Sequence, residues 1–166
     1  MRRRMMLWRR DASAAGLMIL SVLILAGCFG PWFRSEPTPT LYLGEPVIDN
    51  GQGSLRIAVA DMPNGGLAGI HVALGGLLYD QEKVSNLAVE GLNGFVALIQ
   101  QFADGEGGFI LTNVSGIESG PILRLTFEAH GNVKYGDIQL LADSITLVDD
   151  ALLLIEDWNT PAYYAR

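Results

Sequence analysis

The sequence is poor in the side chains that most often carry chemistry. Its 166 residues include one cysteine, Cys28, and two histidines, His71 and His130. A lone cysteine excludes an intramolecular disulfide, and the lack of clustered cysteines and histidines excludes a zinc site of the usual type. Neither a phosphate-binding loop ending in Gly-Lys-Ser/Thr nor a Gly-x-Ser-x-Gly nucleophile turn is present. The sequence therefore predicts a protein that is not an enzyme.

Long apolar runs are also scarce. The one near the N-terminus, residues 14–26, is interrupted by Gly16 and Ser21 and is shorter than the ~20 residues that span a bilayer. Five arginines precede it, and it ends in Leu25-Ala26-Gly27-Cys28, which resembles the lipobox of bacterial lipoproteins. We therefore expect residues 1–27 to be a signal peptide.

That resemblance implies that Cys28 is lipidated and ties an exported chain to a bacterial membrane. Phe29 follows the cysteine, in place of the aspartate associated with inner-membrane retention. We therefore expect the outer membrane or the cell surface. Pro31, Pro37 and Pro39 indicate that residues 28–40 form an extended tether.

Basic residues become rare once the leader is removed. Residues 28–166 keep six basic and seventeen acidic residues, a formal charge of −11. This charge argues against a nucleic-acid partner and against polybasic docking to anionic lipid. Carboxylates in loops are oxygen ligands of the kind that calcium takes, although none has EF-hand spacing and solvated acidic turns are the alternative. The candidate calcium ligands are Asp104, Glu106, Asp149 and Asp150.

Residues 41–166 have the size of one domain with a hydrophobic core and show a period of two that is typical of strands. Apolar residues alternate with polar or small ones around Leu55, Ile57 and Val59, around Ile70, Val72 and Leu74, and around Leu123, Leu125 and Phe127. Turn-forming residues recur about every ten positions, which predicts an all-β sandwich. Residues 87–102 could be taken for a helix, but Gly91, Asn93 and Gly94 favour two strands joined by a turn.

Several segments together resemble the cohesin domain. Gly69–Leu74 forms an alternating strand that leads to Tyr79-Asp80, and a glycine-rich stretch, Gly107–Leu111, follows. The strand Gly120–Phe127 ends in an aromatic residue, and Ile138–Ile155 resembles the closing hairpin. The resemblance covers roughly residues 53–155 and differs from the family pattern at Gln81, where proline is common.

The resemblance implies a jelly-roll β-sandwich of about nine antiparallel strands that performs no chemistry and docks a dockerin-like protein partner through one sheet face. Two alternatives stay open: a carbohydrate-binding module of similar fold that binds polysaccharide, and a structural subunit of an envelope assembly. Candidate partner contacts are Tyr79, Asp80, Phe109 and Ile122. We expect both histidines to be ordinary surface residues, and the tail around Trp158 to pack back on the domain.

Overall fold

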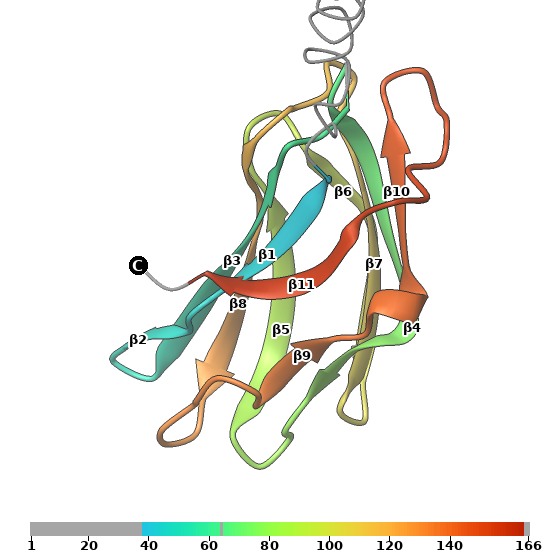
Figure 1. The fold of residues 1–166 in the computed structure, drawn as a ribbon. Helices are drawn as coiled ribbons and strands as arrows, with labels where there is room; N and C mark the ends of the chain where they lie inside the picture. The colour runs from blue at the N-terminus through green and yellow to red at the C-terminus, as the bar shows by residue number, and fades with distance from the viewer. Residues whose placement is uncertain (1–37, 64, 165–166) are drawn as a thin grey trace, which may run out of the picture. The chain divides into compact units, whose positions relative to one another are not determined.

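The computed structural model describes residues 38–63 and 65–164, which belong to one compact unit, Pro37–Arg166. The expected signal peptide, the lipidation of Cys28 and most of the tether lie outside these residues. The described chain is an all-β sandwich with a single 3₁₀ turn, η1 (Ala142–Ser144), which confirms the predicted fold class (Figure 1). The strand that follows the tether begins at Thr40.

In the described part of the chain, eleven strands build the sandwich, two more than the resemblance implied. Two of the eleven, β2 and β9, have only three residues each. In chain order they are β1 (Thr40–Gly44), β2 (Val47–Asp49), β3 (Gln52–Ala60), β4 (Leu67–Tyr79), β5 (Val84–Gly91), β6 (Val96–Ala103), β7 (Glu106–Thr112), β8 (Gly120–Ala129), β9 (Ile138–Leu140), β10 (Ile145–Asp149) and β11 (Asn159–Tyr164).

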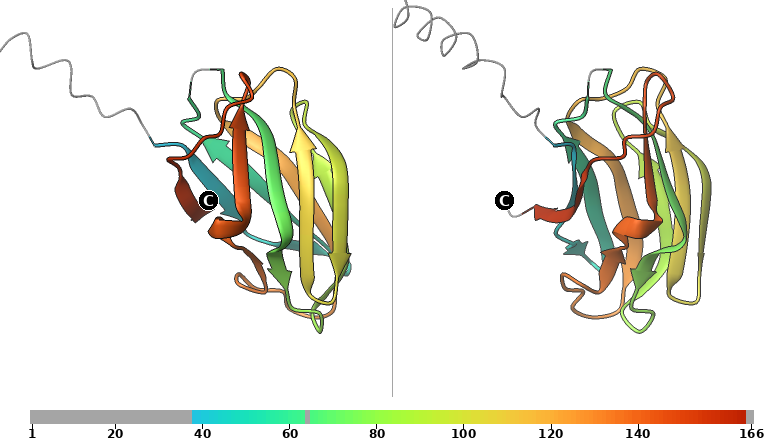
Figure 2. Two further views of the ribbon diagram at one scale, coloured as in Figure 1. Left: turned by 90° about the vertical axis from the view of Figure 1, so that its right-hand side faces the viewer. Right: turned by 45° about the vertical axis from the view of Figure 1, so that its right-hand side comes forward.

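The strands form two sheets that lie face to face, as Figure 2 shows. The first sheet has the order β11-β1-β3-β8-β5, with β2 paired to β3. The second has the order β10-β4-β7-β6, with β9 paired to β4. All pairs are antiparallel except β1 with β11, which is parallel. Neighbours in a sheet are mostly distant in sequence, as expected for a jelly roll.

The core lies between the sheets and is built from the inward half of each alternating strand. Leu55, Ile57 and Val59 of β3 are at most 2% exposed, as the period of two predicts. Leu123, Leu125 and Phe127 of β8 meet them in the same cluster, together with side chains of the second sheet. Burying such a side chain contributes about 1.5–3 kcal/mol, so this shared core holds the two sheets together.

One turn connects the two sheets, and the C-terminal tail covers a sheet edge. Asn93 and Gly94 have positive φ angles of 51° and 89°, and the Phe95 amide donates to the Leu92 carbonyl. This turn carries the chain from β5 of the first sheet to β6 of the second, which confirms the predicted pair of strands joined by a turn. Residues 152–155 are not a strand of their own and make only one bridge, from Leu154 to Val148. The tail packs back on the domain as expected: β11 covers the edge of β1, and Trp158 packs against the core.

Candidate functional site

The outer face of the second sheet collects the side chains that point away from the core on β10, β4, β7 and β6. Strand register places them in cross-strand rows, in which directly opposed side chains lie about 5 Å apart. One row is Ile99, Ile110, His71 and Thr146. The neighbouring row is Val96, Thr112, Gly69 and Val148, which Leu154 extends. We call these two rows, together with Leu98, the β6–β4 face.

Three large, exposed apolar side chains of the β6–β4 face lie together on one edge strand, β6. Val96, Leu98 and Ile99 are 58%, 61% and 58% exposed. An irregularity in the pairing of β6 with β7, between Ala97 and Ile99, interrupts the alternation, so Leu98 and Ile99 are both exposed. Clustered apolar side chains that stay in water mark a contact surface far more often than single ones do.

The middle of the β6–β4 face is mixed in character. Gly69 carries no side chain, and a Cβ built there would lie 3.6 Å from Val148 Cβ, an ordinary contact distance. The exposed ring of His71 lies in the next row between Ile110 and Thr146. A sheet face of apolar side chains with a few polar groups is typical of protein contact surfaces.

The free edge of β6 is tied to the other sheet. The side-chain carbonyl of Gln100 accepts a hydrogen bond from the Val89 amide of β5 at 2.7 Å. This bond joins the two sheets where the sandwich is open between β5 and β6. The outer face of β6 thus remains available while part of its edge is engaged.

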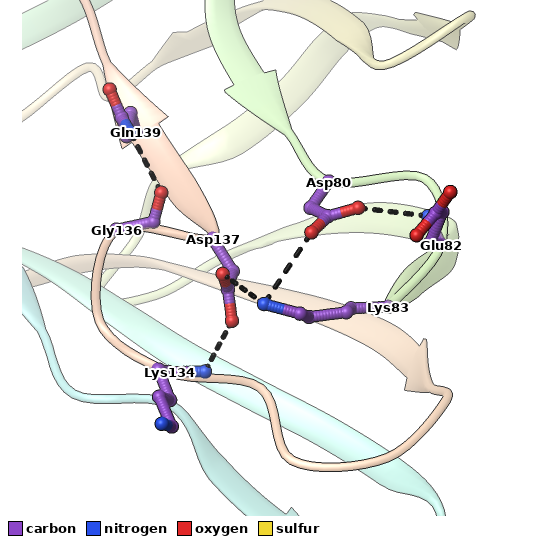
Figure 3. A network of polar contacts seen from close by, with 7 residues as sticks. All are labelled: Asp80, Glu82, Lys83, Lys134, Gly136, Asp137 and Gln139. Carbon is purple, nitrogen blue, oxygen red and sulfur yellow. Dashed lines mark hydrogen bonds and ion pairs between the residues drawn. The ribbon is translucent and has the colours of Figure 1, made fainter.

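A second polar feature lies at the end of β4, where the turn 80–83 meets the loop before β9 (Figure 3). Lys83 Nζ lies 2.7 Å from Asp137 Oδ1 and 3.5 Å from Asp80 Oδ2. Asp137 Oδ2 accepts a hydrogen bond from the Lys134 amide at 2.6 Å, and Asp80 Oδ1 accepts one from the Glu82 amide at 3.0 Å. All four carboxylate oxygens of Asp80 and Asp137 thus take part in holding these two turns.

The charges of this network support one another. The hydrogen bond from Lys83, with help from the Lys134 amide, lowers the pKa of Asp137 below its usual value. In return, the hydrogen bond to Asp137, followed by its negative charge and by Asp80, raises the pKa of Lys83. Both shifted pKa values belong to side chains that connect the turn 80–83 with the loop before β9, and not to side chains in a cleft. They therefore indicate a structural role.

The structure does not bring the four predicted partner contacts together. Phe109 and Ile122 are 1% and 0% exposed, so they belong to the core and not to a surface, which corrects the prediction. Phe109 points inward on β7, whereas Ile122 lies beside the buried Leu123 at a register irregularity of β8. Tyr79 is half-buried against the core, and Asp80 holds the turn described above. Neither side chain lies on the β6–β4 face.

The four candidate calcium ligands fall into two separate pairs. Asp104 forms the two-residue turn between β6 and β7, whereas Asp149 accepts a hydrogen bond from the Leu153 amide at 2.8 Å. Glu106 pairs with Leu78 at one end of β4, and Asp149 pairs with Leu67 at the other end, roughly 35 Å away at strand spacing. Within residues 38–63 and 65–164, no three acidic, histidine or cysteine side chains are grouped as metal ligands would be.

Both histidines are exposed, as predicted. His130 follows β8, and its Nε2 shares a 2.6 Å hydrogen bond with the Ser85 hydroxyl at the surface. His71 belongs to the β6–β4 face. The sequence carries a signal for this face that a period of two does not reveal: Val96-Ala97-Leu98-Ile99 is apolar on both sides of a strand, which a buried strand or an exposed contact surface explains.

Comparison with known proteins supports the fold. No family model and no curated protein matches the sequence. The sixth cohesin of scaffoldin B from Acetivibrio cellulolyticus, solved with a dockerin, is 12% identical over 75% of this chain and 94% of that one, with a TM-score of 0.51. The seventh ScaB type I cohesin from Pseudobacteroides cellulosolvens is 12% identical over 76% and 88%, with a TM-score of 0.52.

The architecture is thus a cohesin-like jelly-roll β-sandwich. At 12% identity this likeness establishes the fold and not the ligand. Among the described residues, no helix is both long and apolar enough to cross a membrane.

Proposed function

We propose that this chain is a non-catalytic, membrane-tethered module that binds a protein partner on its β6–β4 face. The observation that carries the proposal is the run Val96, Leu98 and Ile99, three large apolar side chains that are each more than half exposed on one edge strand. Ile110 continues this apolar surface onto the next strand. Leaving such a surface in water is unfavourable unless a partner covers it.

The fold supports the same proposal. One of the two similar cohesins was solved as a complex with a dockerin, so a sandwich of this shape supports protein docking. A dockerin-like module is therefore the partner class that we propose. Calcium enters the proposal as a requirement to be tested, either through the partner or through the two acidic turns at Asp104 and Asp149.

The tether completes the proposed function. We propose that Cys28 receives the lipid after residues 1–27 are cleaved, and that the sandwich is displayed outside the cytoplasm. Replacing the cysteine, Cys28→Ser, should move the protein from the membrane fraction to the soluble fraction and abolish labelling by a fatty acid. A Cys28→Ser protein that remains in the membrane fraction would contradict the lipid anchor and leave the binding face untouched.

The binding face is tested by capturing partners from the producing organism with the full chain in detergent. Val96→Asp places a charge within the apolar surface and should reduce capture at least tenfold. Val47→Asp is a matched control, because Val47 is 62% exposed on β2 of the other sheet. We expect Val47→Asp to capture the partner as well as the original protein does.

The captured protein should contain a dockerin-like module, and chelation by EDTA shows whether calcium is needed. If Val47→Asp and Val96→Asp lose capture equally, or if neither loses it, the assignment to the β6–β4 face is wrong. Circular dichroism and the thermal midpoint of each variant separate loss of binding from loss of folding.

A further inference from the structure

The outer surface of the first sheet carries a groove of about 1380 Å³ along β1, β3 and β8. The surface is hollowed there because the outward positions of β3 include small side chains such as Ala58 and Ala60. The β2 hairpin forms one wall, and Ser119 to Pro121 lie at one end. This surface belongs to the layer opposite the β6–β4 face (Figure 2).

Two arginines stand side by side in this groove. Arg56 of β3 and Arg124 of β8 are direct cross-strand partners, and both line the groove. They are two of the four lysine and arginine residues between positions 38 and 164, a range that holds sixteen acidic residues. Like charges placed directly opposite each other destabilise a sheet, so their pairing in so acidic a chain calls for a compensating anion.

The chain itself supplies only part of that compensation. Glu90 Oε2 lies 3.2 Å from Arg124 Nη1, but the Glu90 side chain is 57% exposed. Within the described part of the chain, no carboxylate lies within 4 Å of the Arg56 guanidinium. Lys83, by contrast, contacts the carboxylates of both Asp80 and Asp137. Among the described residues, the Arg56 guanidinium therefore has no carboxylate partner of its own.

The other residues that line the groove indicate which class of anion it can bind. Glu45, Asp49, Asn50 and Gln52 line the groove as well, and they offer oxygen atoms that accept hydrogen bonds from hydroxyl groups. The apolar floor of the groove matches the C–H faces of sugar rings. An acidic peptide has a carboxylate for the arginines, but it has few hydroxyl groups for the two acidic side chains. A sugar acid has both.

We propose that this groove binds an acidic polysaccharide, with the carboxylate of a uronic acid residue held between Arg56 and Arg124. Guanidinium groups bind carboxylates through paired, charge-assisted hydrogen bonds, which are stronger than neutral ones. The site is independent of the proposed protein-docking face because the two lie on opposite layers. One chain would then join a protein partner to an anionic glycan.

The test measures binding of hexagalacturonate to the full chain in detergent by titration calorimetry. Arg56→Gln should weaken binding at least tenfold, and the methyl ester of the same oligosaccharide should bind at least tenfold more weakly than the free acid. Lys134→Gln removes the same charge outside the groove and should change the affinity less than twofold. Val96→Asp, on the other sheet, should leave the affinity unchanged.

Arg56→Gln should keep the thermal midpoint, because it relieves a repulsion between like charges. If it fails to fold, Arg56→Lys keeps the charge but loses the paired hydrogen bonds, and should weaken binding by a smaller factor. The proposal is overturned if the original protein does not bind hexagalacturonate, if the ester binds as tightly as the acid, or if the arginine variants match the original. Equal or tighter binding of poly-glutamate would replace the glycan with an acidic peptide and would overturn it as well.

Discussion

The outer faces of the two sheets differ although both sheets contribute to one core. On the second sheet the outward residues include Val96, Leu98 and Ile99, which are large and apolar. On the first sheet the outward positions of β3 and β8 include small side chains and the opposed Arg56 and Arg124. A sandwich can therefore present two chemically distinct surfaces, because the inward residues hold the fold and the outward ones are free to vary.

The largest expected loss of stability comes from a core residue that packs between the two sheets. Phe109→Ala removes a ring that is 1% exposed in the shared core and should lower the free energy of unfolding by about 3–5 kcal/mol. Chemical denaturation measures this change. Ile110→Ala, the next residue and outward, should cost less than about 1 kcal/mol. Equal losses would show that the inward and outward assignments of β7 are wrong.

A smaller loss of stability is expected from a change that should distort the β6–β4 face and spare the groove of the first sheet. Gly108 of β7 lies under an irregular part of β4, and a Cβ there would come within 2.7 Å of the Leu74 nitrogen and 2.8 Å of the Ala73 carbonyl carbon. Backbone atoms have little freedom to move aside, so Gly108→Ala should cost about 1–3 kcal/mol of unfolding free energy. It should also distort the β6–β4 face and weaken partner capture while hexagalacturonate binding persists.

Gly69→Ala is the matched control on the same face, because its new Cβ would meet its nearest atom at 3.6 Å. Its stability should stay within about 0.5 kcal/mol of the original. A loss as large as that of Gly108→Ala would mean that the two positions tolerate a side chain equally poorly, and the comparison between crowded and open positions would fail.

The smallest expected change in stability concerns the ion pair of Lys83 and Asp137, which lies away from both faces. The pKa of Asp137 is lowered in the folded state, chiefly by the hydrogen bond from Lys83. Its contribution to stability is therefore present above its unfolded pKa, near 3.9, and is lost as the pH falls through the lower folded value. Unfolding free energies of the original and of Asp137→Asn should differ at pH 6 and converge in strong acid.

The pKa of Lys83 is raised, so its contribution is present below its unfolded pKa, near 10.4, and is lost only as the pH rises through the higher folded value. Between pH 5 and pH 9 the stability due to this pair should therefore be flat. A steep change within that window would contradict the assignment. Neither partner capture nor hexagalacturonate binding should change in Asp137→Asn.

Alternation alone predicted much of the core, because the same physical rule sets it everywhere: in a strand, every second side chain faces the same way. Leu123, Leu125 and Phe127 are buried as expected. Leu74 is the exception, at 60% exposed, because the pairing of β4 becomes irregular after Val72. A register irregularity beside Gly75, whose φ is 83°, is invisible to a simple period of two.

The surfaces were harder to predict because they depend on which strands become neighbours. Arg56 and Arg124 lie 68 positions apart in the sequence and meet only because β3 pairs with β8. Phe109 and Ile122 were predicted to be exposed apolar contacts, but the structure places both in the core. Strand pairing at long range, such as β1 with β11, is likewise fixed by the whole fold and not by local sequence.

The most direct test of the protein-docking face is hydrogen–deuterium exchange on the full chain in detergent, with and without the captured partner. Binding at the β6–β4 face should slow exchange of amides in β6, β7 and β4, and should leave those of β1, β3 and β8 unchanged. Protection confined to β1, β3 and β8 would place the partner on the groove of the first sheet and would contradict the proposed function.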